Sequence, residues 1–417
     1  MKYTLYAPEK ICGDINLPSS KSISNRALII WALTEGRILP ENLSDCDDTQ
    51  VMINALNNNS EVIDIKAAGT SMRFLTAYLA VTPGTHIITG TERMKHRPIG
   101  ILVDALRYLG ADIEYMEEEG YPPLKITGKH LYGRNVAIPG NVSSQFVTAL
   151  MLIGPTLDEP LSIQLLGDVV SKPYIDLTRS VMNQFGADVE WTDVDTVTVN
   201  AGKYTPRKFV IENDWSAASY WYEMLAMCNS YDSQVNFSGL NDGSRQGDSV
   251  VRYMFSLLGV KTAFTKDKET GIQTMTITRH NRLLPRLEYD FSNQPDQVQA
   301  FVVCCAALGI QFKFTGISTL KLKETDRIKA MKNEMLKLGI VLTEEDENTI
   351  VWDGTRTQAA DHIEIDTYDD HRMAMSFAPL SIIYPGITIN NPEVVTKSYP
   401  SYWEDLEKAG FKIIKEE

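Results

Sequence analysis

The segment at residues 18–28, PSSKSISNRAL, places hydroxyl groups and cations where an apolar helix is expected to begin. The apolar run from residue 27 to residue 33 supplies the buried stripe of that helix, and one of the leading serines can cap it. Free backbone N–H groups at a helix start attract anions, and Lys21 and Arg26 add positive charge beside them. The segment therefore indicates an anion site, although a capped surface helix with two solvated cations fits the same residues.

Two further helix starts carry hydroxyl and amide groups instead of cations. Ser143, Ser144 and Gln145 precede the apolar run 146–153, and Ser171 precedes another helical pattern. Hydroxyl and amide groups at a helix start can hold a phosphate without a cation. Capping is expected at both starts, so ligand binding there is the additional hypothesis.

Two segments between these starts are rich in glycine or cations. In AGTSMR, Gly69 allows the backbone to approach a ligand closely, and a plain helix start is the alternative. In RMKHRP, residues 93–98, four cationic or titratable groups including Arg97 stand together, a pattern suited to a phosphate or carboxylate. A solvated basic loop is the alternative for the second segment.

Two later segments place carboxylates among cations, as acid–base chemistry on an anionic substrate requires. In KETDR, Lys323 and Arg327 lie one helical turn apart, so they can flank one anion while Glu324 points elsewhere as an acid or base. A salt-bridged helix surface is the alternative. In DDHR, residues 369–372, charged groups open a nearly all-apolar helix, which is costly unless they are paired or functional.

Two single charged residues complete the set. Asp296 stands before the apolar run 298–309, as the carboxylates of DDHR stand before theirs. Lys397 lies in the irregular segment VTKSYPSYW, where an exposed loop lysine is the alternative to a ligand-binding one.

An internal repeat organises the elements that must position these residues. Four helix-like segments end in an apolar residue followed by glycine, at Gly110, Gly186, Gly259 and Gly339, with gaps of 76, 73 and 80 residues. Each is followed by a β-rich stretch and then by a second helix with a small or polar start. Chance recurrence of such helix ends, which are common in α/β proteins, is the alternative.

The repeat divides nearly the whole chain into six α/β units. The second helices are expected to begin near Ser143, Ser216, Pro295 and Asp370, and the pattern extends backwards to Ser22 and Thr70. Three units per domain is the simplest division. The polar starts of the buried helices could then face one shared cleft and pool their partial positive charges.

Composition excludes several classes of protein. The chain has 417 residues, 43% of them apolar, which is enough core for two domains, and its apolar runs are too short to span a bilayer. A net charge of −14 argues against general binding to nucleic acid or anionic membranes. The five cysteines and six histidines show no metal-ligand spacing, so we expect reduced thiols, no metal site and a cytosolic protein.

The motifs together resemble a known family. In order, SKSISNRAL, AGTSMR, RMKHRPIG, VSSQF, SKPYI, LKETDR, DDHRMAM and the late Lys397 are similar to the motifs of 5-enolpyruvylshikimate-3-phosphate synthases. The resemblance implies a two-domain inverted α/β barrel in which each domain has three βαβαββ units and the active site lies in the interdomain cleft. It implies that residues 1–20 and 213–417 form one domain and residues 21–212 the other.

The resemblance also implies a reaction. The enolpyruvyl group of phosphoenolpyruvate is transferred to the 5-hydroxyl of shikimate 3-phosphate by addition and elimination, and phosphate is released. Such chemistry needs an acid, a base and cations, with no cofactor. The resemblance further implies a monomeric cytoplasmic enzyme with no nucleic-acid or membrane partner.

The same resemblance implies roles for individual residues. The base on the 5-hydroxyl would be Asp296, the proton donor to phosphoenolpyruvate would be Glu324, and Lys21 would touch both substrates. Shikimate 3-phosphate would be held by Lys21, Ser22, Arg26, Ser143, Ser144, Gln145, Ser171, Asp296 and Lys323. Phosphoenolpyruvate would be held by Lys21, Gly69, Arg97, Gln145, Arg327, Arg372 and Lys397.

The sequence departs from the family pattern around the glycine turn. Ala67 stands where asparagine is usual and Phe74 where proline is usual, and Thr319 replaces an asparagine that contacts shikimate 3-phosphate in many members. The nearest alternative is the sister enzyme that uses UDP-N-acetylglucosamine as acceptor, whose loop usually carries a cysteine where this chain has RMKHRP. A non-catalytic binder of phosphorylated metabolites is the alternative from another class.

Overall fold

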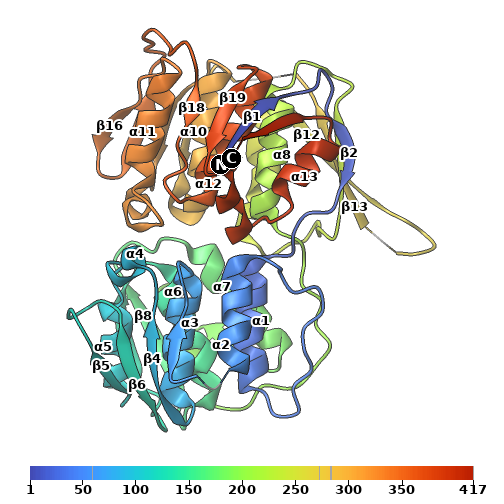
Figure 1. Ribbon diagram of the computed structural model, residues 1–417. Coiled ribbons are helices and arrows are strands. Elements are labelled where there is room, and N and C mark those ends of the chain that lie inside the picture. The colour runs from blue at the N-terminus through green and yellow to red at the C-terminus, as the bar shows by residue number, and fades with distance from the viewer. Residues whose placement is uncertain (59, 272, 282–283, 417) are drawn as a thin grey trace. The chain divides into compact units, whose positions relative to one another are not determined.

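The structure is a computed structural model that describes residues 1–58, 60–271, 273–281 and 284–416 (Figure 1). The chain divides into two compact units, Met1–Pro18 with Glu212–Glu417 (unit 1) and Ser19–Ile211 (unit 2). The boundaries expected from the sequence, after residues 20 and 212, lie two residues and one residue from these. Each unit has a hydrophobic core of its own.

The described residues form five four-stranded sheets that share one topology. In each sheet two parallel strands are paired side by side and two antiparallel strands complete the order, as the register shows for β3, β4, β6 and β5. One α-helix joins the parallel strands in four of the sheets, whereas all of unit 2 lies in sequence between β2 (Cys12–Ile15) and β11 (Gln234–Ser238) in the fifth. With a second helix before the antiparallel pair, each sheet belongs to a βαβαββ unit, the repeat that the sequence predicts.

Unit 2 contains two complete repeats. Their sheets have the strand orders β3 (Val62–Asp64), β4 (Gly84–Thr89), β6 (Leu124–Gly128), β5 (Asp112–Tyr115) and β7 (Asn135–Pro139), β8 (Leu161–Leu166), β10 (Thr196–Val199), β9 (Val189–Trp191). The third repeat is reduced among the described residues to two helices and the parallel bridge between Glu41 and Val210. Unit 2 therefore has helices for three repeats but four-stranded sheets for two of them among the described residues.

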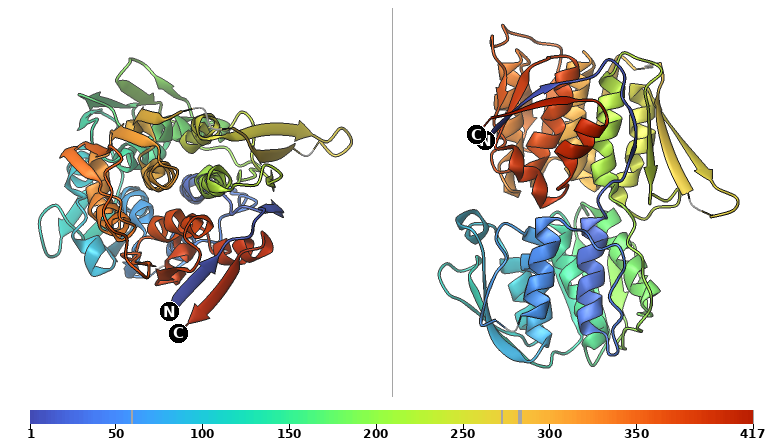
Figure 2. Two further views of the ribbon diagram at one scale, coloured as in Figure 1. Left: turned by 90° about the horizontal axis from the view of Figure 1, so that it is seen from above. Right: turned by 45° about the vertical axis from the view of Figure 1, so that its right-hand side comes forward.

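Unit 1 contains three complete repeats. Their sheets have the orders β12 (Val260–Lys266), β13 (Gln273–Arg279), β11 (Gln234–Ser238), β2 (Cys12–Ile15); β14 (Arg286–Asp290), β15 (Gln311–Thr315), β17 (Thr349–Trp352), β16 (Thr343–Asp346); and β18 (Glu364–Ile365), β19 (Ile387–Asn390), β1 (Lys2–Tyr6), β20 (Lys412–Glu416). In the last sheet β1 lies between β19 and β20, so the two chain ends are side by side (Figure 1). The β12–β13 hairpin projects beyond the helices of this unit (Figure 2).

The helices fall into two kinds, as the repeat predicts. One kind is nearly all-apolar and buried: α8 (Trp215–Met227), α10 (Val298–Ala307) and α12 (His371–Phe377) in unit 1, and α1 (Lys21–Leu33), α3 (Gly69–Val81) and α6 (Ser144–Ile153) in unit 2. The other kind is amphipathic or short: α2 (Asp47–Asn57), α4 (Glu92–Lys95), α5 (Gly100–Tyr108), α7 (Lys172–Gln184), α9 (Val251–Met254), α11 (Arg327–Lys337) and α13 (Tyr402–Lys408). Small or polar residues open α1, α3, α6 and α12, whereas α8 opens with Trp215 after the capping Asp214 and α10 opens with Val298.

The glycines that mark the repeat close helical segments in left-handed geometry. The φ angles of Gly110, Gly186, Gly259 and Gly339 are 103°, 81°, 85° and 72°. A side chain would strain this conformation, so glycine is favoured where the helix must stop and the chain must turn into a strand. No helix among the described residues is long and apolar enough to cross a membrane.

Candidate active site

The start of α1 presents Lys21 beside a buried carboxylate. Ser20 caps the helix by accepting a hydrogen bond from the backbone N–H of Ile23 at 3.4 Å. Lys21, the first helical residue, pairs with Asp48 of α2 at 3.1 Å. The capping that the sequence predicts is therefore confirmed.

One turn further along α1, Arg26 is buried and surrounded by neutral oxygen atoms. Its Nε donates to Thr178 at 2.8 Å, and its Nη1 donates to the carbonyl oxygen of Ser22 at 2.7 Å. Its Nη2 donates to Thr148 at 3.4 Å and to the carbonyl oxygen of Tyr174 at 3.3 Å. Burial lowers the pKa of Arg26 to about 10, and no carboxylate forms an ion pair with it among the described residues. Its positive charge is thus held in place and left for a ligand.

Gly69 and Arg97 are in direct contact. Gly69 is the first residue of α3, and a Cβ added there would lie 2.7 Å from Nη1 and 2.8 Å from Nη2 of Arg97. Arg97 is 8% exposed, and its Nε has no hydrogen-bond partner in the described part of the chain. The close approach that Gly69 permits is therefore that of a guanidinium group. Of the cluster in RMKHRP, Arg93 and His96 are exposed and Lys95 pairs with Glu92 and Glu117, so only Arg97 is a buried cation.

The two hydroxyl-bearing starts differ from each other. Ser143 caps α6 by accepting from the N–H of Gln145 at 3.3 Å, and the Gln145 amide reaches Thr70 of α3 at 3.1 Å. Ser171 occupies the cap position of α7 with φ 57° and ψ 29°, and its side chain makes no capping hydrogen bond. The expectation that Ser171 caps the helix is wrong, because a left-handed cap residue turns its hydroxyl away from the first turn. That hydroxyl is then not used by the helix.

In unit 1, Asp296 lies among three cations. It belongs to the single 3-10 turn Pro295–Gln297 that leads into α10. Its Oδ1 pairs with Arg327 Nη1 at 2.9 Å and Lys323 Nζ at 3.4 Å, and its Oδ2 pairs with Arg372 Nη2 at 3.1 Å. Burial acts to raise the pKa of Asp296, but Arg372, Lys323 and Arg327 outweigh it and hold the pKa well below its ordinary value. Asp296 is therefore ionised at neutral pH.

Glu324 is the second carboxylate of this group. It pairs with Arg327 at 2.9 Å and with Lys397 at 3.0 Å, and Lys397 is buried at the end of the 3-10 helix Pro392–Lys397. The expectation that Glu324 points away from the cations is wrong. Asp326 caps α11 and Arg327 opens it, so Glu324 lies three residues from Arg327 and reaches back to its guanidinium group. The exposed-loop alternative for Lys397 is wrong as well.

Sequence reasoning missed two residues that touch these arginines. Asp370 is fully buried and accepts from Arg327 Nε at 2.7 Å and Nη2 at 3.3 Å. The Tyr220 hydroxyl accepts from Arg372 at 3.2 Å, and burial raises its pKa to about 12. The costly DDHR start signalled Asp370, whereas nothing in the local sequence signalled Tyr220, which comes from α8.

Ion pairs join the expected site residues of unit 1 into one group, whereas those of unit 2 lie at the starts of α1, α3, α6 and α7 and at Arg97. Unit 2 carries Lys21, Ser22, Arg26, Gly69, Arg97, Ser143, Ser144, Gln145 and Ser171, and unit 1 carries Asp296, Lys323, Glu324, Arg327, Arg372 and Lys397. In unit 1, Lys323, Arg327, Arg372 and Lys397 pair with carboxylates, whereas Arg26 and Arg97 in unit 2 are buried and form no ion pair with any carboxylate that the structure describes. Both groups can bind anions, and only the group in unit 1 also offers carboxylates for proton transfer.

Comparison with known proteins shows which family the chain resembles. A family model described as EPSP synthase (3-phosphoshikimate 1-carboxyvinyltransferase) matches residues 5–61 and 56–406. A 3-phosphoshikimate 1-carboxyvinyltransferase of Bacteroides fragilis is 53% identical over 413 residues, which are 99% of each chain. One of Photobacterium profundum is 37% identical over 431 residues, covering 97% of each chain.

The chain belongs to the EPSP synthase family.

Solved structures agree on the fold of this family. EPSP synthase from Acinetobacter baumannii has a TM-score of 0.77 at 22% identity, covering 99% of this chain and 100% of that one. The enolpyruvyl transferase NikO from Streptomyces tendae has a TM-score of 0.73 at 16% identity, covering 99% and 98%. The two-domain α/β architecture predicted from the motifs is confirmed.

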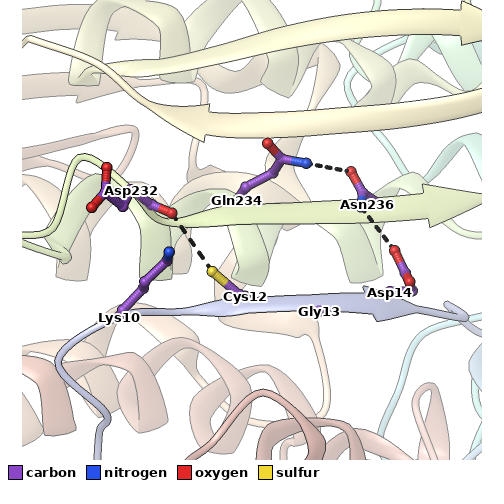
Figure 3. Close-up of a pocket in the computed structure, with 7 residues that line it drawn as sticks. All are labelled: Lys10, Cys12, Gly13, Asp14, Asp232, Gln234 and Asn236. Atoms are coloured by element: carbon purple, nitrogen blue, oxygen red, sulfur yellow. Dashed lines mark hydrogen bonds between the residues drawn. The ribbon is translucent and has the colours of Figure 1, made fainter.

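An open recess elsewhere on unit 1 contains none of these site residues. It lies along β2 and β11 and is lined by Lys10, Cys12, Gly13, Asp14, Asp232, Gln234 and Asn236 (Figure 3). Its polar side chains bond to one another, as Asn236 does to Asp14 at 2.8 Å. No group of three or more His, Cys, Asp or Glu residues in the described ranges is arranged to hold a metal ion.

Proposed function

We propose that the chain transfers the enolpyruvyl group of phosphoenolpyruvate to the 5-hydroxyl of shikimate 3-phosphate and releases inorganic phosphate. Membership of the EPSP synthase family supports this reaction. The observation that carries it is the pair of carboxylates, Asp296 and Glu324, which share Arg327 within a group of four cations. An acid–base pair among cations is what addition and elimination on a phosphorylated enol require.

The proposed reaction has two steps. A proton adds to the methylene carbon of phosphoenolpyruvate while the 5-oxygen, losing its own proton, forms a bond to C2 and gives a tetrahedral ketal phosphate. The new methyl group then loses a proton, the C2–O bond to phosphate breaks, and the carbon–carbon double bond is restored. We assign Asp296 as the base on the 5-hydroxyl and Glu324 as the proton donor to the methylene carbon.

The ion pairs of these two carboxylates suggest how substrates activate them. As long as Arg327, Lys323 and Arg372 pair with Asp296, the pKa of Asp296 is low and the carboxylate is a weak base. A substrate carboxylate or phosphate that takes over part of these cations would raise its basicity. In the same way, phosphoenolpyruvate at Arg327 and Lys397 would free Glu324 to take up a proton.

The remaining residues are proposed to bind substrate. Arg26 would hold the carboxylate of shikimate 3-phosphate, and Ser143, Ser144 and Ser171 its phosphate. Support comes from the buried charge of Arg26 and from the Ser171 hydroxyl, which the helix does not use. Lys21, Ser22, Gln145 and Lys323 would complete this set, and Gly69, Arg97, Arg327, Arg372 and Lys397 would hold phosphoenolpyruvate. Two arginines suit a planar carboxylate because each offers a fork of N–H groups.

The first experiment measures phosphate release from phosphoenolpyruvate with either shikimate 3-phosphate or UDP-N-acetylglucosamine as acceptor. Release with the first acceptor alone is expected. Release only with the second would identify the sister enzyme, and binding of shikimate 3-phosphate without any release would identify a metabolite-binding protein.

The second experiment tests the two assigned carboxylates. Asp296→Asn and Glu324→Gln are each expected to lower kcat by about two orders of magnitude or more while shikimate 3-phosphate still binds in calorimetry. Glu288→Gln, an exposed substitution in the same unit, is the matched control and is expected to leave kcat unchanged. Normal turnover by either site variant would remove that assignment.

Two expectations about the setting of the enzyme stay predictions. Among the described residues no disulfide bond joins any of the five cysteines, which supports a reducing compartment such as the cytoplasm. Light scattering on the purified protein would test whether it is a monomer.

A further inference from the structure

The turn that leads into α12 is strained. Tyr368 and Asp369 are consecutive residues with φ angles of 53° and 54°. Side chains with a Cβ disfavour this left-handed region, and two such residues in a row are rarer still. Contacts outside the turn must therefore hold it in place.

A buried carboxylate of α11 supplies two of those contacts. Glu334 is fully buried, and its Oε2 accepts a hydrogen bond from the backbone N–H of Asp366 at 3.0 Å. Its Oε1 accepts from the Tyr368 hydroxyl at 2.7 Å, and Lys337 balances its charge at 2.7 Å. Glu334 thus fixes the chain at Asp366, two residues before the strained pair, and at Tyr368, the first residue of that pair.

Asp370, the residue after the strained pair, contacts both Arg327 and Arg372. Asp370 accepts from Nε and Nη2 of Arg327, and its Oδ1 also caps α12 by accepting from the backbone N–H of Arg372 at 2.9 Å. The position of this one carboxylate therefore sets the plane of one guanidinium group and the start of the helix that carries the other. Arg327 is the first residue of α11, and Glu334 lies two turns further along the same helix. The residue that holds the turn and the arginine that Asp370 binds are therefore fixed relative to each other by one rigid helix.

We infer that Glu334 and Tyr368 are positioning residues for phosphoenolpyruvate binding. By holding the strained turn they place Asp370, and through it Arg327 and Arg372, in the geometry that accepts the substrate carboxylate. The inference rests on the proposed function, in which these two arginines bind phosphoenolpyruvate.

The test begins with Tyr368→Phe, which removes one hydroxyl from a side chain that is 37% exposed. The KM for phosphoenolpyruvate is expected to rise about three- to tenfold, as the loss of a hydrogen bond to a charged group allows, with little change in kcat. The KM for shikimate 3-phosphate is expected to stay within about twofold. Tyr384→Phe is the matched control, because this half-buried tyrosine makes no side-chain hydrogen bond to another described residue.

A rescue experiment separates positioning from general stability. Glycine adopts the left-handed region without strain, so Asp369→Gly added to Tyr368→Phe is expected to return the KM for phosphoenolpyruvate to within about twofold of the wild-type value. Glu334→Gln is expected to raise the same KM, and combining it with Tyr368→Phe is expected to give less than the product of the two effects, because both act on one contact.

The outcomes distinguish this inference from the proposed function. An unchanged KM for phosphoenolpyruvate in Tyr368→Phe, or an equal rise in the KM of both substrates, would overturn the positioning role. A wild-type enzyme that released no phosphate with shikimate 3-phosphate would instead overturn the proposed function.

Discussion

At the scale of single residues, the protein buries guanidinium groups in two ways. Arg327 is surrounded by Asp370, Glu324 and Asp296, whose charges outweigh burial and raise its pKa. Arg26 is surrounded by hydroxyl and carbonyl oxygens, and burial lowers its pKa to about 10. The first arrangement neutralises the charge and the second preserves it, so Arg26 is the better prepared of the two to attract an anion.

The Arg26 network leads to a prediction about Thr178. Thr178→Val keeps the shape of the side chain but removes the oxygen that accepts from Arg26 Nε at 2.8 Å. The KM for shikimate 3-phosphate is expected to rise about tenfold, because a hydrogen bond to a charged group is lost, while the KM for phosphoenolpyruvate changes little. Steady-state kinetics with each substrate varied in turn provides the measurement.

A matched control exists in the same unit. Thr76 is buried in α3 and donates to the carbonyl oxygen four residues earlier, as Thr178 does in α7, but it does not contact Arg26. Thr76→Val should therefore leave both KM values unchanged. If both variants weakened shikimate 3-phosphate equally, the hydrogen bond to Arg26 would not be the cause.

Glu223 in α8 leads to a prediction about pH. Both of its carboxyl oxygens are buried without a hydrogen-bond partner in the described part of the chain, and burial raises its pKa well above 4.5. The folded protein then keeps a proton that the unfolded chain releases, so this residue makes stability fall as pH rises above about 4.5. Cys305 and Tyr402, the titratable groups that feel its charge, have raised pKa values and stay neutral near pH 7.

Glu223→Gln removes this titration. Relative to wild type, the variant is expected to gain about 1.4 kcal/mol per pH unit above pH 5, or about 3 °C in melting temperature. Melting curves at pH 5, 6, 7 and 8 provide the measurement, with the exposed Glu9→Gln as control. Parallel curves for wild type and Glu223→Gln would show that Glu223 does not hold a proton in the folded state.

At the scale of secondary-structure elements, the same kind of helix start is used in different ways. Ser20 and Ser143 cap their helices, Ser171 stands in a left-handed cap position, and Gly69 leaves room for a guanidinium group. All of these starts have backbone N–H groups that can bind an anion. The side chains that remain for a ligand are those that do not already cap the helix, such as the hydroxyl of Ser171.

Gly69 leads to a prediction at this scale. Gly69→Ala would bring a methyl group to 2.7 Å from Arg97 Nη1, and the flexible side chain of Arg97 would have to move. We expect the KM for phosphoenolpyruvate to rise about tenfold or more, because small displacements of a binding group are costly, with the melting temperature almost unchanged. Gly202→Ala, where nothing lies within 4 Å of the added Cβ, is the control for kinetics and melting. Unchanged kinetics in Gly69→Ala would exclude Arg97 from the phosphoenolpyruvate site.

The elements and their starts could be predicted from the sequence, but the contacts of several charged residues could not. The helices that end in glycine and the polar helix starts follow from local sequence patterns, and the ordered motifs predicted the family and its fold. The partners of Arg327 include Asp296 and Asp370, which lie 31 and 43 residues away. Residues 323–325 lie outside the helices, so the helical spacing expected for Lys323 and Arg327 misplaced Glu324. Helical spacing also describes only neighbours within a turn, so it left Asp370 unassigned.

The reduced third repeat of unit 2 shows the same limit. The spacing of polar helix starts predicts a unit at residues 22–69, and α1 and α2 are present there. Its sheet has shrunk to one bridge between Glu41 and Val210, at opposite ends of the unit's sequence. Whether the segment around Glu41 becomes a strand depends on its backbone hydrogen bonds to the segment around Val210, which lies far away in the sequence.

At the scale of the whole molecule, the two units differ in how the chain builds them. Unit 2 is one continuous stretch, Ser19–Ile211, with its own core. Unit 1 needs residues 1–18, because β1 lies between β19 and β20 and β2 forms an edge of another sheet. Connectivity therefore predicts which part of the chain can fold alone.

We predict that a fragment of residues 19–211 folds and melts cooperatively, whereas residues 212–417 alone do not. The second fragment lacks the strand that joins β19 to β20, so both lose a hydrogen-bonded partner. Near-ultraviolet circular dichroism during heating provides the measurement.

A joined chain is the control for this prediction. The carbonyl oxygen of Pro18 accepts from the N–H of Asp214 at 2.8 Å, so a short glycine–serine linker can connect residues 1–18 to residues 212–417. This chain should regain a cooperative transition. A cooperative transition in residues 212–417 without the first eighteen residues would contradict the argument.

The position of β1 between β19 and β20 also affects the order in which the two units fold during synthesis. Leu5 is synthesised 382 residues before its partner Ile387 and 408 residues before its partner Ile413. At about 5–20 residues per second, β1 waits roughly 20 to 80 s before either partner exists, and unit 2 is completed during that interval. A nascent chain stalled after residue 300 should therefore resist protease over residues 19–211 while β1, residues 2–6, is still cut.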